Sequence, residues 1–413
     1  MARVAIVGSG ISGLACAEML RSRHDVVVFE GAGRPGGHAR TLMADGVAVD
    51  TGFIVYNEVN YPLLTGFFRH LGIATQSSDM SFGVRLDDGR VEYAASNLRG
   101  LFAQPMNILS AAHWSMLRDT LRFFRQAPSV LASPDDPSLG QLLDNMQLGR
   151  PFRERFLIPM GAAIWSTPPD QMLAFPAKTF VRFFQNHGLL SISGQHPWRT
   201  VSGGSGCYVG KMVQRLGTSL RLAAPVTKVS GQAGNIKLWT SADAPEFFDA
   251  VVFACHADET LRLLRDATDD ERAVLGAFTF RDNEAVLHRD KRLMPGKKAA
   301  WASWIYASNQ SGAEQDLSVT YWMNRLQNLQ GPDLFVTLNP DREIPEALVL
   351  DRYIFRHPVF SRQAIAAQAK LSRIQGQRGA WFCGAWQRYG FHEDGIWSAE
   401  RVARGLGGVV PWA

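Results

Sequence analysis

The amino-acid sequence predicts an α/β fold in which a parallel sheet is interleaved with a second, α+β domain. Three short apolar runs predict it, at residues 4–7, 249–256 and 381–385. Continuous apolar runs of this length are typical of parallel strands buried on both faces. Because the runs are far apart in a chain of 413 residues, the sheet that contains them must be assembled from separate stretches.

The composition is that of a globular protein, with 46% hydrophobic and 20% charged residues. It excludes a disordered chain and a collagen-like fibre, and the length predicts two or three domains. The net charge of +5 is too small to indicate a nucleic-acid partner. The four cysteines form no Cys-x-x-Cys pair, so we expect reduced thiols and no metal site.

The first strand, Val4–Val7, runs into a glycine-rich turn of the form Gly-x-Gly-x-x-Gly, followed by a helical pattern. In such a turn Gly8 permits the tight bend and Gly10 lets the backbone approach a pyrophosphate. Gly13 lets the helix pack closely on the strand. The helix N-terminus, with Ser12, supplies free N–H groups and a positive dipole end for the phosphates. We therefore predict a Rossmann-like dinucleotide site.

A second apolar strand ends at Glu30, twenty residues after Gly10. This is the spacing at which a carboxylate accepts hydrogen bonds from the adenosine ribose. Glu30 would repel a 2′-phosphate, so a dinucleotide that carries one is excluded. NAD and FAD remain as candidate ligands.

The next segment, Gly36-Gly37-His38-Ala39-Arg40-Thr41, resembles the second glycine motif of the flavin amine oxidoreductase superfamily. That superfamily includes amine oxidases, protoporphyrinogen oxidases and phytoene desaturase-like carotenoid desaturases, and its usual motif is GGRxxT. His38 stands where the family has arginine, and Arg40 is two positions further along. The resemblance implies FAD as the cofactor. No cysteine lies at a recognised linkage position, so we expect it to be non-covalent.

Two further segments resemble FAD motifs of the same superfamily. Asp50-Thr51-Gly52 resembles its Asp-x-Gly step, and the C-terminal strand, turn and helix resemble its last motif. The resemblance implies that FAD contacts residues in all of these motifs: Gly8, Gly10, Ser12, Gly13, Glu30, Gly31, Gly36, Gly37, His38, Ala39, Arg40, Thr41, Thr51, Gly52, Val226, Gly384, Asp394, Gly395 and Ile396.

Val226 belongs to a middle segment that resembles the family's strand beside the adenine, and a second middle strand covers residues 249–256. We therefore expect an FAD-binding domain built from residues 1–55, 200–270 and 372–413. Residues 56–199 and 271–371 then form the substrate domain.

The substrate domain combines basic and aromatic residues. Apolar residues recur at helical spacing from Leu109 to Phe124, a pattern typical of a helix that packs against a core. Arginines such as Arg118 and Arg122 share these helices, and they fit either a solvated helix face or a surface that meets anionic lipid.

Large aromatics concentrate in the second half of the substrate domain, for example Trp301, Trp304 and Tyr321. These strings resemble a subgroup of the superfamily that is associated with cyclopropane-fatty-acid-type lipid methyltransferases. The resemblance implies a lipid acyl chain as substrate, and an acyl tunnel needs apolar walls.

Candidate catalytic residues follow from the same resemblance. Amine oxidases of the family have a lysine near flavin N5, whereas residues 278–288 contain Asn283 and no lysine. They also have an aromatic residue two positions before the last acidic residue, where this chain has His392. We expect His392 to act as a proton acceptor, with Asn283 and Tyr56 as further catalytic candidates.

The sequence thus predicts an FAD-dependent oxidoreductase that desaturates a lipid acyl chain, such as a methylated unsaturated fatty acyl group, by hydride transfer to flavin N5. The alternatives are an amine or polyamine oxidase and a flavin-binding accessory protein without turnover. The N-terminal strand leaves no room for a signal peptide, and no apolar run reaches the ~20 residues of a membrane span. We expect a cytoplasmic protein, bound peripherally to the inner face of an anionic membrane.

Overall fold

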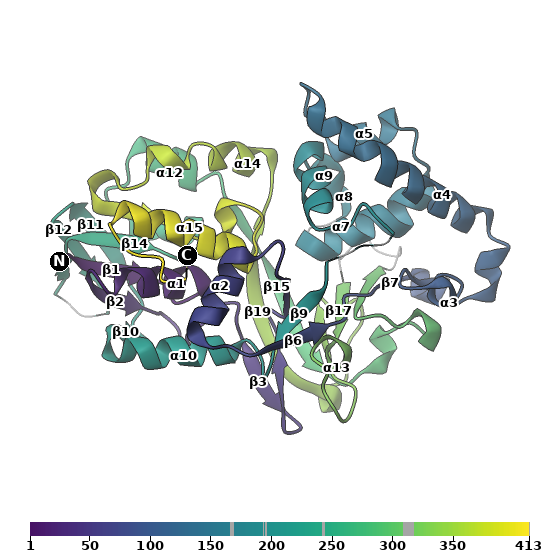
Figure 1. The fold of residues 1–413 in the computed structure, drawn as a ribbon, viewed down its shortest axis with the longest axis horizontal. Coiled ribbons are helices and arrows are strands. Elements are labelled where there is room, and N and C mark those ends of the chain that lie inside the picture. The colour runs from purple at the N-terminus through teal and green to yellow at the C-terminus, as the bar shows by residue number, and fades with distance from the viewer. Residues whose placement is uncertain (166–168, 193, 195, 242–243, 309–317, 413) are drawn as a thin grey trace.

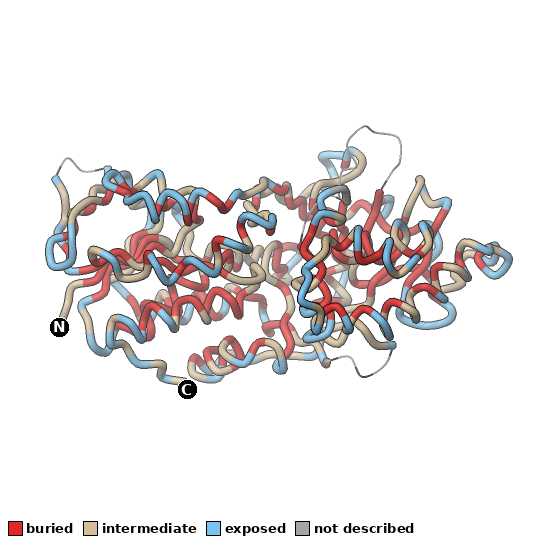
Figure 2. Tube along the Cα trace, turned by 90° about the horizontal axis from the view of Figure 1, so that it is seen from above, coloured by how far each residue is buried: buried red, intermediate tan, exposed pale blue. Residues whose placement is uncertain are grey.

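A computed structural model describes residues 1–165, 169–192, 194, 196–241, 244–308 and 318–412. The chain forms two lobes joined by small sheets, and both termini lie in the same lobe (Figure 1). Buried segments run through the interior of both lobes (Figure 2). The limits predicted for the two domains stay a prediction.

A five-stranded parallel sheet forms the centre of the lobe that contains the termini. Its strand order is β10 (Leu220–Arg221), β2 (Asp25–Phe29), β1 (Arg3–Val7), β14 (Ala250–Phe253) and β20 (Ala380–Phe382). The strands come from four distant parts of the chain, and the predicted α/β class is confirmed.

Alternate side chains of β1 face two different layers, as the pleat of a strand requires. Val4 and Ile6 pack against helices α1 (Ile11–Leu20) and α15 (His392–Gly405). Ala5 and Val7 pack on the opposite face, against the antiparallel sheet of β11 (Lys228–Gln232), β12 (Asn235–Trp239) and β13 (Glu246–Phe248). The remaining helices of this lobe are α2 (Pro62–Leu71), α10 (Gly206–Leu216), α11 (Ala257–Leu263), α12 (Asp269–Leu275) and α14 (Arg362–Gln368).

Helix α1 is buried along its whole length because α15 covers it. A Cβ on Gly395 would lie 2.8 Å from side-chain atoms of both Ile11 and Ser12, so the two helices can approach this closely only at a glycine. Gly395, in the last motif, therefore lets the C-terminal helix α15 pack closely against the first helix, α1.

The second lobe contains a seven-stranded mixed sheet, and all its pairs are antiparallel except β16 with β7. Its order is β19 (Val349–Val359), β15 (Thr279–His288), β18 (Phe335–Leu338), β17 (Ser318–Trp322), β16 (Trp304–Ser308), β7 (Phe82–Leu86) and β8 (Val91–Ala94). The short helix α13 (Met323–Leu326) follows β17.

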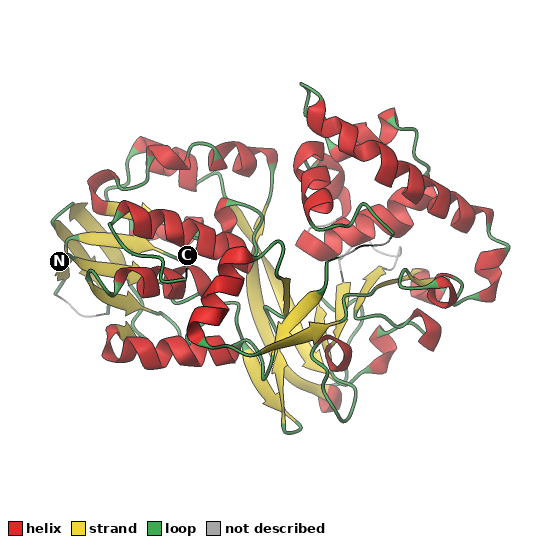
Figure 3. Ribbon diagram, in the orientation of Figure 1, coloured by secondary structure: helices red, strands yellow, loops and turns green. Residues whose placement is uncertain are grey.

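Helices gather beside this sheet (red in Figure 3), and one of them contains most of the helical pattern predicted from Leu109 to Phe124. They are α3 (Leu98–Leu101), α4 (Ala111–Gln126), α5 (Leu139–Asn145), α6 (Arg150–Phe152), α7 (Ile158–Trp165), α8 (Pro169–Ala174) and α9 (Ala177–Asn186). The stripe predicted for α4 is partly wrong: His113, Met116 and Phe123 face the core, whereas Leu109 and Leu121 are exposed.

Two small antiparallel sheets lie between the lobes. One pairs β3 (Thr41–Ala44) with β4 (Val47–Asp50), and the other has the order β5 (Val55–Asn57), β9 (Trp198–Val201), β6 (Thr75–Ser78). None of the described helices is both long enough and apolar enough to cross a bilayer.

Candidate functional site

A cavity of about 560 Å³ extends from the glycine-rich turn after β1 into the second lobe. Gly8, Gly10 and Glu30 line one end, and Trp165 and Tyr321 line the other. Its size is in the range of small-molecule and cofactor sites.

Two glycine turns meet at the first end of the cavity. Gly8 has a φ of +107°, and a Cβ on Gly13 would lie 1.9 Å from the Gly8 carbonyl oxygen, so both positions require glycine. A Cβ on Gly37 would lie 3.1 Å from the Cα of Gly10, whereas a Cβ on Gly10 would meet no atom within 4 Å. The backbone of Gly10 therefore faces open space at a helix N-terminus, which fits a dinucleotide pyrophosphate.

Glu30 lines the cavity at the end of β2 and is held in one orientation. One carboxylate oxygen accepts hydrogen bonds from the Ser9 amide (3.0 Å) and the Ser9 hydroxyl (2.5 Å). The other accepts from the Ala32 amide at 2.9 Å. An ionised carboxylate has about four acceptor sites, so capacity is left for a ribose hydroxyl. These features fit the adenosine half of FAD.

The predicted cofactor residues divide into two groups. Nine line the cavity: Gly8, Gly10, Ser12, Glu30, Gly37, His38, Thr51, Gly52 and Gly384. The other ten do not line it: Gly13, Gly31, Gly36, Ala39, Arg40, Thr41, Val226, Asp394, Gly395 and Ile396.

Arg40 shows why a motif residue can lie outside the wall. Its guanidinium makes a bidentate ion pair with the Asp351 carboxylate on β19, with N–O distances of 2.6 and 3.1 Å. The guanidinium also lies 4.5 Å from the centre of the Tyr353 ring. The side chain therefore braces β19 and does not face the cavity, which corrects the predicted cofactor contact.

Thr41 is held by a buried carboxylate in the same way. Its hydroxyl donates to Asp50 at 2.5 Å and accepts from the Gly206 amide at 2.7 Å. Burial raises the pKa of Asp50 to about 6, while hydrogen bonds from Thr41 and Ser205 act in the opposite direction. Asp50 also accepts from the Gln327 amide at 2.9 Å. The cluster ties β4 to the start of α10 and to the second lobe.

Asp394 and Ile396 also lie behind the wall. The Asp394 carboxylate accepts from the Phe391 amide at 3.0 Å, which caps the N-terminus of α15, and burial raises its pKa to about 6. Ile396 is fully buried in the core of the first lobe. These two side chains therefore position α15, and the contacts of Asp394 and of the Ile396 backbone N–H with FAD stay predictions.

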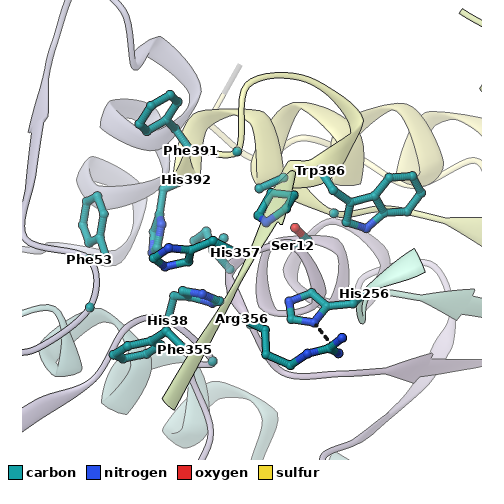
Figure 4. A pocket seen from close by; sticks show the side chains of 18 of the residues that line it. Ser12, His38, Phe53, His256, Phe355, Arg356, His357, Trp386, Phe391 and His392 are labelled. Carbon is teal, nitrogen blue, oxygen red and sulfur yellow. Dashed lines mark hydrogen bonds between the residues drawn. The ribbon is translucent and has the colours of Figure 1, made fainter. Parts of the chain in front are cut away.

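Four histidines line the middle of the cavity: His38, His256, His357 and His392. The ring centroids of His38 and His357 are 5.4 Å apart and the rings are stacked, and Phe355 lies against His38 at 5.0 Å. Figure 4 shows that the four rings come from separate segments of the chain. His256 lies three residues after the end of β14, and the sequence predicts this strand, whereas nothing around His357 indicates its position.

Burial keeps three of these imidazoles, those of His38, His357 and His392, uncharged. It lowers the pKa of His357 to about 4 and that of His392 to about 3, and it holds the pKa of His38 well below its ordinary value. Repulsion from neighbouring histidines adds to the shifts of His38 and His357. The nearby Arg356 is paired with Asp258 at 2.8 Å and Glu259 at 3.1 Å, so its charge is compensated.

His392 lines the cavity as predicted, at the start of α15. Its ring stacks on Phe53 with centroids 3.8 Å apart, and its Nε2 lies 3.0 Å from the Tyr208 hydroxyl. A group with a pKa of about 3 is uncharged and a weak base at neutral pH. This pKa disfavours the predicted role of His392 as the proton acceptor, which stays a prediction until the rate of a variant is measured.

Tyr56 and Asn283, the other catalytic candidates, do not line the cavity. Tyr56 on β5 is buried against Tyr61 and Phe68, and the alternation of the strand turns the neighbouring Val55 towards the cavity in its place. Asn283 is fully buried on β15, where it accepts from Asn339 at 2.9 Å. Neither side chain faces the cavity, which corrects both predictions.

The far end of the cavity is apolar and largely aromatic. Its walls come from α7, β16, β17 and β18 and from the loop before β7, with Met80, Ala163, Ile164, Trp165, Trp304, Tyr321 and Leu338. Trp165 packs on Phe183 and Phe175, with ring centroids 4.7 and 5.0 Å apart. Among the described lining residues, the charged ones are Glu30, Glu259 and Arg356, none of which belongs to this end.

Comparisons with known proteins agree with this geometry. Residues 11–273 match the family described as flavin containing amine oxidoreductase. A protein named as a flavin-containing monoamine oxidase, AofH of Mycobacterium tuberculosis, is 27% identical over 248 residues, which are 56% of this chain. The match covers 52% of AofH, so the chain spans about half the length of this relative.

Solved structures share the fold over 98% of this chain. Putrescine oxidase has a TM-score of 0.70 at 17% identity, and the match covers 98% of its chain. A CLA-producing fatty acid isomerase from P. acnes also has a TM-score of 0.70, at 14% identity and with 98% of its chain covered. Cyclohexylamine oxidase from Brevibacterium oxydans has a TM-score of 0.67 at 14% identity, with 99% of its chain covered.

Proposed function

This chain belongs to the flavin-containing amine oxidoreductase family and its cofactor is FAD, and from that premise we propose that it dehydrogenates the acyl chain of a lipid. The observation that carries the proposal is the apolar end of the cavity, which Trp165, Trp304 and Tyr321 line without a charged neighbour.

An acyl chain matches this end of the cavity better than an amine does. Each methylene buried there contributes about 0.8 kcal/mol, and no polar group of the chain has to lose its water. An alkylammonium ion is charged at neutral pH, and burying it without a carboxylate partner costs several kcal/mol. The described lining residues at this end include no aspartate or glutamate.

The relatives point in two directions. Putrescine oxidase and cyclohexylamine oxidase have the same fold, and so does a protein described as a fatty acid isomerase. Since the likeness to all three concerns the fold alone, we choose between the two substrate classes from the lining of the cavity. The aromatic, uncharged end favours the fatty acyl substrate.

The roles of the chain's own residues follow from their positions. Gly10, Gly37 and Glu30 would hold the dinucleotide. The uncharged imidazoles of His38, His357 and His392 place no charge beside an apolar substrate. FAD supplies a two-electron acceptor for the hydride of one C–H bond. The adjacent carbon gives its proton to a base, the chain gains a double bond, and molecular oxygen or an electron carrier takes up the two electrons.

Anaerobic exposure of the purified yellow holoprotein to a total lipid extract tests the proposal. We expect bleaching of the flavin absorbance by the extract and no bleaching by putrescine or cyclohexylamine. Bleaching by the amines alone would instead identify an amine oxidase. A flavin that neither class reduces would identify an accessory protein without turnover.

A further inference from the structure

Helices α3 and α4 project away from the parallel sheet at the end of the second lobe (Figure 1). Large apolar side chains are exposed on this part of the chain. We call them the α3–α4 patch. Its exposed fractions are high: Leu98 75%, Met106 70%, Ile108 55%, Leu109 78%, Trp114 51% and Leu121 47%. A contiguous apolar surface of this kind marks an interaction site.

Contacts between the elements make the patch one surface. The Trp114 indole donates to the Ile108 carbonyl at 2.8 Å, and its ring centroid lies 5.4 Å from that of Phe102 on the α3 side. Leu121 follows Trp114 by seven residues on α4, so the two side chains share a face of the helix. The exposed Ile108, Trp114 and Leu121 are therefore grouped on one side of α4.

Positive charge surrounds and interrupts this surface. Arg118 and Arg125 lie on the same face of α4 as Trp114 and Leu121, and Arg99 lies beside Leu98 on α3. Lys297 and Lys298 are exposed on the segment that contacts α3.

Two acidic side chains near the patch, Asp119 and Asp88, are ion-paired with arginines. Asp119 on α4 is buried and ion-paired with Arg118 and Arg122. Asp88, on the turn after β7, is ion-paired with Arg342, and Asp87 lies beside it. The exposed charge among the apolar side chains is therefore positive.

We propose that the α3–α4 patch docks the protein on an anionic lipid surface. Leucine and tryptophan side chains enter the headgroup layer, and the arginines lie at its surface beside lipid phosphates. The core of a protein–protein interface is depleted of charge, whereas here arginines stand between the apolar residues, which favours lipid over a second copy of the chain. The inference does not depend on the proposed reaction.

Sedimentation of the FAD-loaded protein with vesicles tests this proposal. Vesicles of phosphatidylglycerol and phosphatidylcholine should carry the protein into the pellet at low salt, and pure phosphatidylcholine vesicles should not. Arg99→Gln and Arg125→Gln should each lower the partition coefficient about fivefold, since one basic residue near an anionic surface contributes about 1 kcal/mol. The double variant Leu98→Glu/Leu109→Glu should lower it at least tenfold.

Met43→Glu is the matched control, because Met43 is 72% exposed on the hairpin of β3 and β4, away from the patch. It should sediment as the unmodified protein does. Absence of binding to the anionic vesicles, equal binding to the neutral ones, or unchanged binding of the leucine variant would each overturn the proposal. So would a dimer in vesicle-free solution that Leu98→Glu/Leu109→Glu dissociates, because the patch would then bind a second copy.

Discussion

Gly10 is the residue on which FAD binding depends most directly. Its φ of −67° is open to any L-amino acid, and a Cβ there would meet no protein atom within 4 Å. A side chain at this position would instead fill the space that faces the phosphate-binding helix N-terminus.

We therefore expect Gly10→Val to fold normally and to be purified without FAD. Gly33→Val is the control, because Gly33 is exposed, has no atom within 4 Å of its Cβ position and does not line the cavity. The flavin absorbance per protein measures occupancy, and circular dichroism measures folding. A yellow Gly10→Val protein would contradict the position assigned to the pyrophosphate.

A substitution of His392 tests whether this residue accepts the proton or only lines the cavity. A general base contributes roughly 10²–10⁴-fold to a rate, whereas a pKa of about 3 makes this imidazole a weak base at pH 7. We expect His392→Ala to keep its FAD and to slow anaerobic flavin reduction by less than about tenfold. Stopped-flow absorbance measures that rate, and a loss of a hundredfold or more would restore His392 as the base.

Among the elements, α15 and α2 are joined by one buried carboxylate. Glu393, on the first turn of α15, accepts from the backbone amides of Leu63 (3.0 Å) and Leu64 (2.9 Å) at the start of α2. Burial raises its pKa to about 7, while the two backbone hydrogen bonds act in the opposite direction and Asp394 adds to the increase.

This junction predicts how stability depends on pH. Because the pKa of Glu393 is about 7 in the folded protein and 4.5 in the reference state, the folded protein binds this proton more tightly. Its contribution, about 3 kcal/mol, is complete below pH 4.5 and is lost as the pH rises through 7. Glu393→Gln should therefore remove part of the fall in unfolding free energy between pH 4.5 and 7. Urea unfolding at several pH values measures it, and an unchanged slope would contradict the assignment.

The elements also show which features the sequence predicts well. Strands β1 and β2 and the turn between them are encoded by contiguous residues, so periodicity and glycine spacing suffice to place them. The orientation of Tyr56 depends on which face of the short strand β5 meets the cavity, and no pattern in three residues settles that. Arg40 turns away from the cavity because Asp351, more than 300 residues later, binds it.

The middle of the cavity illustrates the same limit for the site. Its histidines come from four separate segments, and only the packing of both lobes brings them together. The motifs indicated His38 and His392 because these residues adjoin FAD signatures. His357 lies on β19 of the second lobe, where its place depends on the pairing of β19 with β15. The exposure of Leu109 likewise depends on how α4 lies on its neighbours.

At the scale of the whole molecule, bound FAD should stabilise the association of distant parts of the chain. Lining residues come from the turn after the first strand, the last helix and the second lobe, so a ligand bound there stabilises their association. Saturating FAD at about 100 times its Kd should add about 2.7 kcal/mol to the free energy of unfolding. Thermal melts of apoprotein across an FAD series measure this gain, and a melting temperature independent of FAD would contradict it.

The measurement that tests the central claim most directly follows the substrate itself. The holoprotein is reduced anaerobically by a lipid whose acyl chain is fully deuterated, and the product is analysed by mass spectrometry. Acyl dehydrogenation predicts the loss of two deuterium atoms and one new double bond for each flavin reduced. An acyl chain recovered with all its deuterium, while an amine bleaches the flavin, would contradict the account.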